Sequence, residues 1–164
     1  MSDAKEITTW TDFGDAIDSL TNDIEKSGFK PDCILAIARG GLMVAGALSY
    51  RLGIKNIQTV NVEHYTGNGL DDTASGDPRI LPPGLQTESL KGKRVLVVDD
   101  VTDSGDTIGF ISSLIGFEVE DQRNAVWFAK NRASIRPDFV ATKTDLWVVF
   151  PWSPHSPEAH SDLG

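Results

Sequence analysis

The chain has 164 residues, of which 40% are hydrophobic, and a formal net charge of −9 at pH 7; this is the size and composition of one globular domain. The acidic balance argues against a binder of nucleic acid or of anionic membranes, because such proteins present basic patches. A single cysteine, Cys33, excludes a disulfide framework, and the absence of a secretory signal in residues 1–6 and of a long apolar run favours a cytoplasmic protein.

The N-terminal third predicts a helix, a strand and a second helix. Residues 33–38 are almost all apolar, which is typical of a strand covered on both faces of a parallel sheet. Residues 39–41, Arg-Gly-Gly, interrupt the pattern, and residues 42–52 predict the second helix. The first helix, which Thr11 could cap and Gly28 ends, carries one apolar face formed by Phe13, Ala16, Ile17, Leu20 and Ile24.

The middle of the chain predicts two strands separated by an irregular segment. Residues 57–62 alternate enough for a strand, and residues 94–98, RVLVV, predict a buried one. Between them, residues 65–88 are rich in Gly, Asp, Pro and Thr. A segment of this length inside a compact domain is typically a functional lid or a disordered stretch, although a tolerated surface insertion has the same composition.

The last third again alternates helix and strand. Residues 107–115 predict a helix, and three extended runs follow at residues 125–129, 138–141 and 146–150. Strands that alternate with helices of about ten residues predict an α/β fold with a mainly parallel twisted sheet flanked by helices. We expect one domain over residues 1–152 and a mobile tail over residues 153–164.

The segment 95–107, VLVVDDVTDSGDT, carries the strongest chemical signal. A hydrophobic strand leads into Asp99 and Asp100, crosses a turn of small residues and enters a helix, whose free N–H groups suit a phosphate. Gly105 lets the backbone approach a ligand closely, and adjacent carboxylates suit ribose hydroxyls or Mg²⁺. Hydroxyl donors come from Thr102, Ser104 and Thr107. The alternative is a capped strand–turn–helix with solvated acids.

Two known families share parts of this segment. VLVVDD also opens the receiver domain of response regulators, but that domain needs far more chain than follows Asp100. The whole segment resembles the phosphoribosyl diphosphate (PRPP) signature of type I phosphoribosyltransferases. Residues 37–42, IARGGL, resemble that family's pyrophosphate loop. The purine-binding segments of bacterial xanthine-guanine phosphoribosyltransferases are similar to WFAK and LWVVFPW, at residues 127–130 and 146–152.

The resemblance implies a purine phosphoribosyltransferase of the type I fold with a flexible lid loop. Such an enzyme converts Mg²⁺-bound PRPP and a 6-oxopurine (guanine, xanthine or hypoxanthine) into a nucleoside 5′-monophosphate and pyrophosphate, in purine salvage. Because the transition state at the ribose C1 is oxocarbenium-like, the pyrophosphate must be stabilised as it leaves. A carboxylate must also manage the proton of the base. The resemblance further implies a homodimer or homotetramer.

The PRPP-site roles carry over by position. Asp103 matches the catalytic acid that faces N7 of the base. Asp99 and Asp100 would contact the ribose hydroxyls and support Mg²⁺, with Asp100 the better metal candidate. The 5′-phosphate would be bound by the loop of Thr102, Ser104, Gly105, Asp106 and Thr107, and the pyrophosphate by Arg39, Gly40 and Gly41.

The base-site and lid roles carry over in the same way. Lys130 would donate to the exocyclic O6 of the base, although a lysine at a strand end can simply be exposed. Trp147 would stack on the base, although an aromatic residue in an apolar strand is as often core, as we expect for Trp10 and Trp127. The carbonyl of Val148 would meet the N2 edge. Tyr65 matches the aromatic residue at the root of the lid.

Three positions depart from the family pattern and keep alternatives open. His64 stands where the family more often has serine, Asp106 adds a negative charge inside the phosphate loop, and Ser153 replaces an acid of the xanthine-guanine enzymes. One alternative is therefore a regulator on the same fold that senses PRPP or a nucleotide without catalysis. Another is a phosphoribosyltransferase for a different base.

Overall fold

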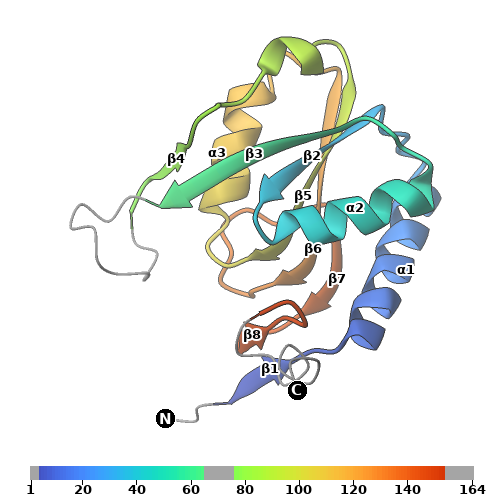
Figure 1. The fold of residues 1–164 in the computed structure, drawn as a ribbon, viewed down its shortest axis with the longest axis vertical. Helices are drawn as coiled ribbons and strands as arrows, with labels where there is room; N and C mark the ends of the chain where they lie inside the picture. Colours follow the sequence, from blue (N-terminus) through green and yellow to red (C-terminus); the bar gives the residue numbers. More distant parts are fainter. Residues whose placement is uncertain (1–3, 65–75, 154–164) are drawn as a thin grey trace, which may run out of the picture.

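The structure is a computed structural model that describes residues 4–64 and 76–153. Six strands in these residues are β2 (Cys33–Ala38), β3 (Ile57–His64), β4 (Pro78–Ile80), β5 (Arg94–Thr102), β6 (Asp121–Ala129) and β7 (Phe139–Lys143). They form one sheet in the order β4-β3-β2-β5-β6-β7 (Figure 1). All neighbours are parallel except β3 and β4, which are antiparallel. The predicted mainly parallel α/β sheet is confirmed.

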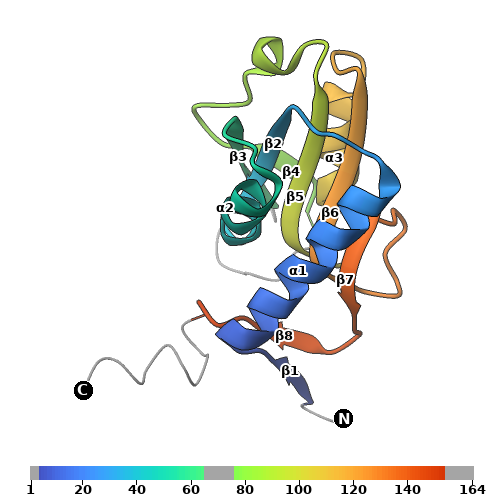
Figure 2. The ribbon, with the colours of Figure 1, turned by 90° about the vertical axis from the view of Figure 1, so that its right-hand side faces the viewer.

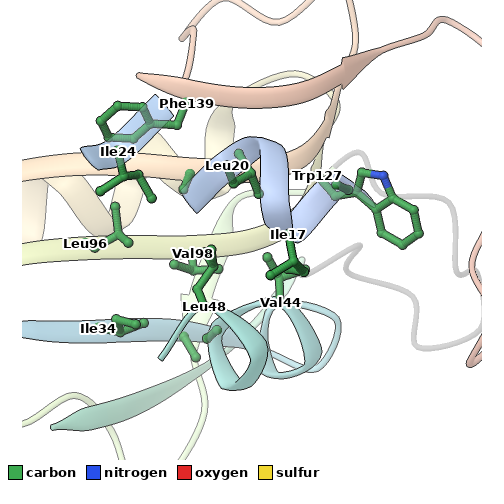
Figure 3. Close-up of a cluster of buried hydrophobic side chains, with 14 of the residues drawn as sticks. Ile17, Leu20, Ile24, Ile34, Val44, Leu48, Leu96, Val98, Trp127 and Phe139 are labelled. Carbon is green, nitrogen blue, oxygen red and sulfur yellow. The ribbon is translucent and has the colours of Figure 1, made fainter. Parts of the chain in front are cut away.

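Helices cover both faces of this sheet. α1 (Trp10–Ser27) and α2 (Gly41–Leu52) lie on one face, and α3 (Asp106–Ile115) lies on the other (Figure 2). Along β2, Ile34 packs with α1 and α2, whereas the next residue, Leu35, packs with α3. Full burial of such a side chain stabilises the fold by about 1.5–3 kcal/mol. Figure 3 shows the cluster under α1 and α2, including Ile17, Leu20, Ile24, Val44, Leu48, Leu96 and Val98.

A small second sheet joins the N-terminal segment to the end of the described chain. β1 (Lys5–Ile7) pairs in parallel with β8 (Trp147–Val149). Thr8 extends the contact, because its N–H donates to the carbonyl oxygen of Val149 at 3.0 Å and its hydroxyl donates to the same oxygen at 2.9 Å. Both strands lie beyond the carboxyl ends of β6 and β7 (Figure 1). No helix in the described residues is long and apolar enough to cross a membrane.

Several predicted boundaries were wrong. The cap of α1 is Thr9 rather than Thr11, because Thr9 and Asp12 form a reciprocal capping box. β5 continues to Thr102, so the acid pair lies inside the strand rather than after it. The segment predicted as irregular contains β4 and the start of a 3-10 turn, η1 (Thr87–Leu90). β1 was not predicted, since three residues carry too little pattern to indicate a strand.

Candidate active site

The turn between β2 and α2 forms the first wall of the site. Gly40 and Gly41 bring this turn directly against β5. A Cβ atom on Gly40 would lie 1.7 Å from Oδ2 of Asp100, and one on Gly41 would lie 2.5 Å from the carbonyl oxygen of Val98. Neither position has room for a side chain. The predicted pyrophosphate loop and the predicted acid pair are therefore in contact.

Asp99 and Asp100 lie near the carboxyl end of β5. The N–H of Asp100 donates to Oδ1 of Asp99 at 2.9 Å, and the N–H of Val101 donates to Oδ1 of Asp100 at 2.7 Å. Burial raises the pKa of Asp99 well above its ordinary value, and the neighbouring charge of Asp100 raises it further. Burial also raises the pKa of Asp100. A bound cation would favour the ionised form of both groups.

The acid pair suits Mg²⁺ that is shared with a ligand. The described residues contain no group of three or more His, Cys, Asp or Glu side chains that could hold a metal ion by themselves. Mg²⁺, however, is usually held by one or two carboxylates, with substrate phosphates and water as its other ligands. Asp99 and Asp100 supply two carboxylates at one strand end, so the donor set fits an ion that binds together with a phosphorylated substrate.

The loop from β5 into α3 forms the second wall. Gly105 has a φ of 96°, in the left-handed region that favours glycine, and a Cβ there would lie 2.8 Å from the backbone nitrogen of Ile135. The hydroxyl of Ser104 donates to Oδ2 of Asp106 at 2.6 Å. Above this loop lies a cavity of about 430 Å³, whose lining runs from Val101 through Ile108 and also includes His64, Asp99 and Arg132. The N–H groups of the first turn of α3 make this wall suitable for phosphate.

Asp103 makes a two-pronged ion pair that the sequence did not suggest. Nε of Arg132 donates to Oδ1 of Asp103 at 2.7 Å, and Nη2 donates to Oδ2 at 2.5 Å. These hydrogen bonds raise the pKa of Arg132. Arg132 reaches Asp103 because the segment after β6 folds back, where the N–H of Ser134 donates to the carbonyl oxygen of Ser104 at 2.8 Å. The one signal for this ion pair in the sequence was Arg132 itself, a second cationic residue two positions after Lys130.

A second cavity, of about 500 Å³, adjoins the first. The two cavities share Val101, Asp103 and Arg132. The remaining lining of the second cavity combines polar and apolar side chains: Lys5, Lys130, Asp145, Trp147, Val148, Val149, Phe150 and Ser153. The ammonium of Lys130 donates to the carbonyl oxygen of Leu146. The structure thus brings the predicted base-site residues together beside the predicted catalytic carboxylate.

The aromatic residues divide into core and surface. Trp147 is 74% exposed, so it is not a core residue. Trp127 is buried, as predicted, whereas the prediction that Trp10 is core was wrong, since Trp10 is 48% exposed at the start of α1. Tyr50 on α2 is 91% exposed and does not pack in the core. Tyr65, the predicted lid residue, lies outside the described residues.

Comparison with known proteins identifies the family of this chain. The phosphoribosyl transferase domain family matches residues 3–159. A xanthine-guanine phosphoribosyltransferase of Gluconobacter oxydans is 32% identical over 121 residues, which cover 73% of this chain and 67% of that protein.

Two solved structures share the fold across nearly the whole chain. A purine phosphoribosyltransferase from Pyrococcus horikoshii superposes with a TM-score of 0.77 at 32% identity, covering 91% of this chain and 94% of that one. A hypothetical protein from Neisseria gonorrhoeae with bound ppGpp superposes with a TM-score of 0.80 at 27% identity, covering 98% and 95%. The chain belongs to the phosphoribosyl transferase domain family and is a transferase enzyme.

Proposed function

We propose that the protein transfers the phosphoribosyl group of PRPP to a 6-oxopurine, giving a nucleoside 5′-monophosphate and pyrophosphate in purine salvage. The observation that carries this proposal is the pair of adjoining cavities that share Asp103. One is lined by a phosphate-type loop and a buried acid, and the other by an exposed tryptophan and a lysine. A ribose would lie where the two cavities meet, with its C1 near Asp103.

Each residue of the PRPP side has a defined task in this proposal. The N–H groups and hydroxyls between Thr102 and Thr107 bind the 5′-phosphate. Asp99 and Asp100 hold the ribose hydroxyls and the Mg²⁺ ion, which when bound neutralises charge that develops on the departing pyrophosphate. Arg39 and the N–H groups of Gly40 and Gly41 bind the pyrophosphate itself.

The base side controls orientation and the proton. Trp147 stacks on the purine, Lys130 donates to O6, and the carbonyl oxygen of Val148 accepts from the N2 edge. Asp103 exchanges a proton with N7 as the bond at N9 forms or breaks. For Asp103 to act, the guanidinium of Arg132 must release one carboxylate oxygen to the base. An exposed ion pair of this kind opens readily.

A substrate panel tests the proposal. The protein is incubated with PRPP, Mg²⁺ and each of hypoxanthine, guanine, xanthine, adenine and uracil, and pyrophosphate release is followed. We expect turnover with at least one 6-oxopurine and none with uracil. No turnover with any purine overturns the proposal. The relative rates of pyrophosphate release with guanine, xanthine and hypoxanthine also show how Ser153, which lines the second cavity, affects the choice of base.

A homo-oligomer is part of the same proposal. α2 exposes three large apolar side chains, with Leu42 41%, Met43 38% and Tyr50 91% exposed. Large exposed apolar patches mark protein–protein contacts, and we propose that these side chains form part of such a contact with another copy. Sedimentation of the protein should give a dimer or tetramer; a monomer at working concentration contradicts this part.

The second candidate function is a nucleotide sensor. It is favoured by the bound ppGpp in the gonococcal structure, which covers 98% of this chain. In this case the same two cavities take a guanine nucleotide with several phosphates, and Asp103 has no catalytic task. Calorimetry with ppGpp and with PRPP, run beside the substrate panel, separates the candidates: binding of either ligand without turnover favours the sensor.

A further inference from the structure

His64 bridges two segments at the edge of the phosphate cavity. Its Nδ1 lies 2.9 Å from the carbonyl oxygen of Gly76, and its Nε2 lies 2.9 Å from Oγ1 of Thr107 in the first turn of α3. A carbonyl oxygen can only accept, so Nδ1 carries a hydrogen. In the neutral imidazole Nε2 is then the acceptor, and the hydroxyl of Thr107 donates to it.

A bound phosphate would compete for this hydroxyl. A phosphomonoester dianion offers acceptors and no donor, so Thr107 can bind it only by turning its O–H away from His64. The acceptor Nε2 would then face a lone pair of Oγ1 at hydrogen-bond distance, which is unfavourable. A proton on Nε2 removes the conflict, because Nε2–H donates to Oγ1 while the hydroxyl donates to phosphate.

The charges around the cavity also favour a proton on Nε2 of His64. Its lining includes the carboxylates of Asp99, Asp103 and Asp106, and the guanidinium of Arg132 is already paired with Asp103. On the β3–β4 side, Glu63 is ion-paired with Arg79, and Asp77 lies beside Gly76. Among the described residues that line the cavity, His64 is therefore the group that can supply a new positive charge when a dianion enters.

We propose that His64 takes up a proton when the 5′-phosphate binds, and that the imidazolium orients Thr107 toward the phosphate. This inference rests on the proposed function, in which the loop from Thr102 to Thr107 holds the 5′-phosphate. It assigns His64 as a positioning residue that acts through Thr107. The affinity for the phosphate should therefore fall as the pH rises wherever the complex holds this proton and the free protein does not, by up to about tenfold per pH unit for one proton.

Calorimetry with ribose 5-phosphate tests the proposal, because this probe carries the phosphate without base or pyrophosphate. At about pH 8 the phosphate is already a dianion, so protons bound on association enter the protein. Titrations in buffers of different ionisation enthalpy should give an uptake of roughly 0.5–1 proton per ligand in the native chain.

Two variants assign the proton. His64→Gln places a neutral amide N–H near the position of Nε2, so it should bind ribose 5-phosphate within about tenfold of the native chain, without proton uptake and with a flat pH dependence. His155→Gln, a matched histidine change, should keep the full uptake. Loss of uptake in His64→Gln alone supports the proposal. No uptake in the native chain, or uptake that persists in His64→Gln, overturns it.

The substrate panel distinguishes a failure of the His64 proposal from a failure of the proposed function. Turnover with a purine but no proton uptake overturns the role of His64 alone. If ribose 5-phosphate does not bind and no purine is turned over, the loop does not bind the 5′-phosphate as proposed. The proposed role of His64 is then wrong as well.

Discussion

Asp103 meets two competing demands, because one carboxylate faces both a cation and the place proposed for the base. Arg132 donates hydrogen bonds to both of its oxygens. The side chains of Arg132 and Asp103 are 71% and 53% exposed, so solvent screens their attraction. The pair can therefore hold the carboxylate in place without preventing a base from taking one oxygen.

The first prediction concerns this carboxylate. Asp103→Asn keeps the shape of the side chain but removes its ability to accept a proton, so kcat should fall about 10²–10⁴-fold. The KM for PRPP should change little, because the phosphate loop and the acid pair remain. Asp18→Asn is the matched control. Asp18 lies on the surface of α1, is also half exposed, and is ion-paired with an arginine, Arg51 of α2. An unchanged kcat in Asp103→Asn removes the residue from its role.

The second prediction concerns the cost of burying Asp99. Its pKa is raised in the folded state, first by burial, so the folded state binds the proton more tightly than the unfolded state. The stability of the ligand-free protein should therefore fall as the pH rises from about 4, the ordinary value for an aspartate, through the raised pKa. Asp99→Asn should reduce this fall, and the part that remains comes from Asp100, whose pKa is also raised by burial.

Thermal unfolding without ligand measures the effect. The variant should have a higher Tm than the native chain at about pH 8, and the difference should shrink toward pH 4. For a protein of this size each kcal/mol gained corresponds to about 2–4 °C. The affinity for Mg²⁺-PRPP should fall in the same variant. A lower Tm at pH 8, or a difference that does not depend on pH, contradicts the argument.

The contiguous residues of the candidate site are the ones whose common location the sequence predicts without a family resemblance. Residues 99–107 follow one another along a strand and a helix start, so their common location follows from local structure alone. Arg132 and the partner of His64 could not be found in this way. Both contacts depend on how separate segments fold against the loop, as the 2.9 Å distance between His64 and Thr107 shows.

At the scale of elements, the sequence predicted which segments are strands better than where they end. β5 extends to Thr102 because Val101 and Thr102 pair with Phe128 and Ala129 of β6. Acidic residues are disfavoured in strands, so Asp99 and Asp100 led to the prediction that the strand ends before them. Pairing with β6 continues the strand past them instead. The β2–turn–α2 unit was better defined, since paired glycines after a buried strand indicate a close approach of backbone.

The third prediction tests that close approach. Gly40→Ala would place a methyl group 1.7 Å from Oδ2 of Asp100, so the turn or the carboxylate must move. The affinity for PRPP should fall at least tenfold, since both are proposed to bind it. Gly46→Ala is a control in the adjoining helix, where a Cβ meets nothing within 4 Å. It should leave binding unchanged and stabilise the fold by up to about 1 kcal/mol. Equal affinities in the two variants contradict the contact.

At the scale of the whole molecule, the cavity proposed for the base is completed by two segments that lie far apart in the sequence, β1 and β8. Thr8 and Val149 are joined by hydrogen bonds across a separation of 141 residues. This pairing brings Lys5 to a cavity whose other lining residues all lie between Val101 and Ser153. A three-residue strand at each end has no local pattern strong enough to predict such a contact, because its stability comes from the partner strand.

The net charge of −9 leads to the last prediction. The acidic groups next to the cavity proposed for PRPP would repel a ligand with many phosphate charges, unless a cation lies between them. PRPP binding should therefore require Mg²⁺, and a chelator should weaken it at least tenfold, which corresponds to about 1.4 kcal/mol. Asp100→Asn should make the affinity less sensitive to chelator. Ribose 5-phosphate is the control, because it lacks the pyrophosphate that shares the ion, and its affinity should change little. If PRPP binds as tightly with chelator as with Mg²⁺, the acid pair does not work through a metal ion.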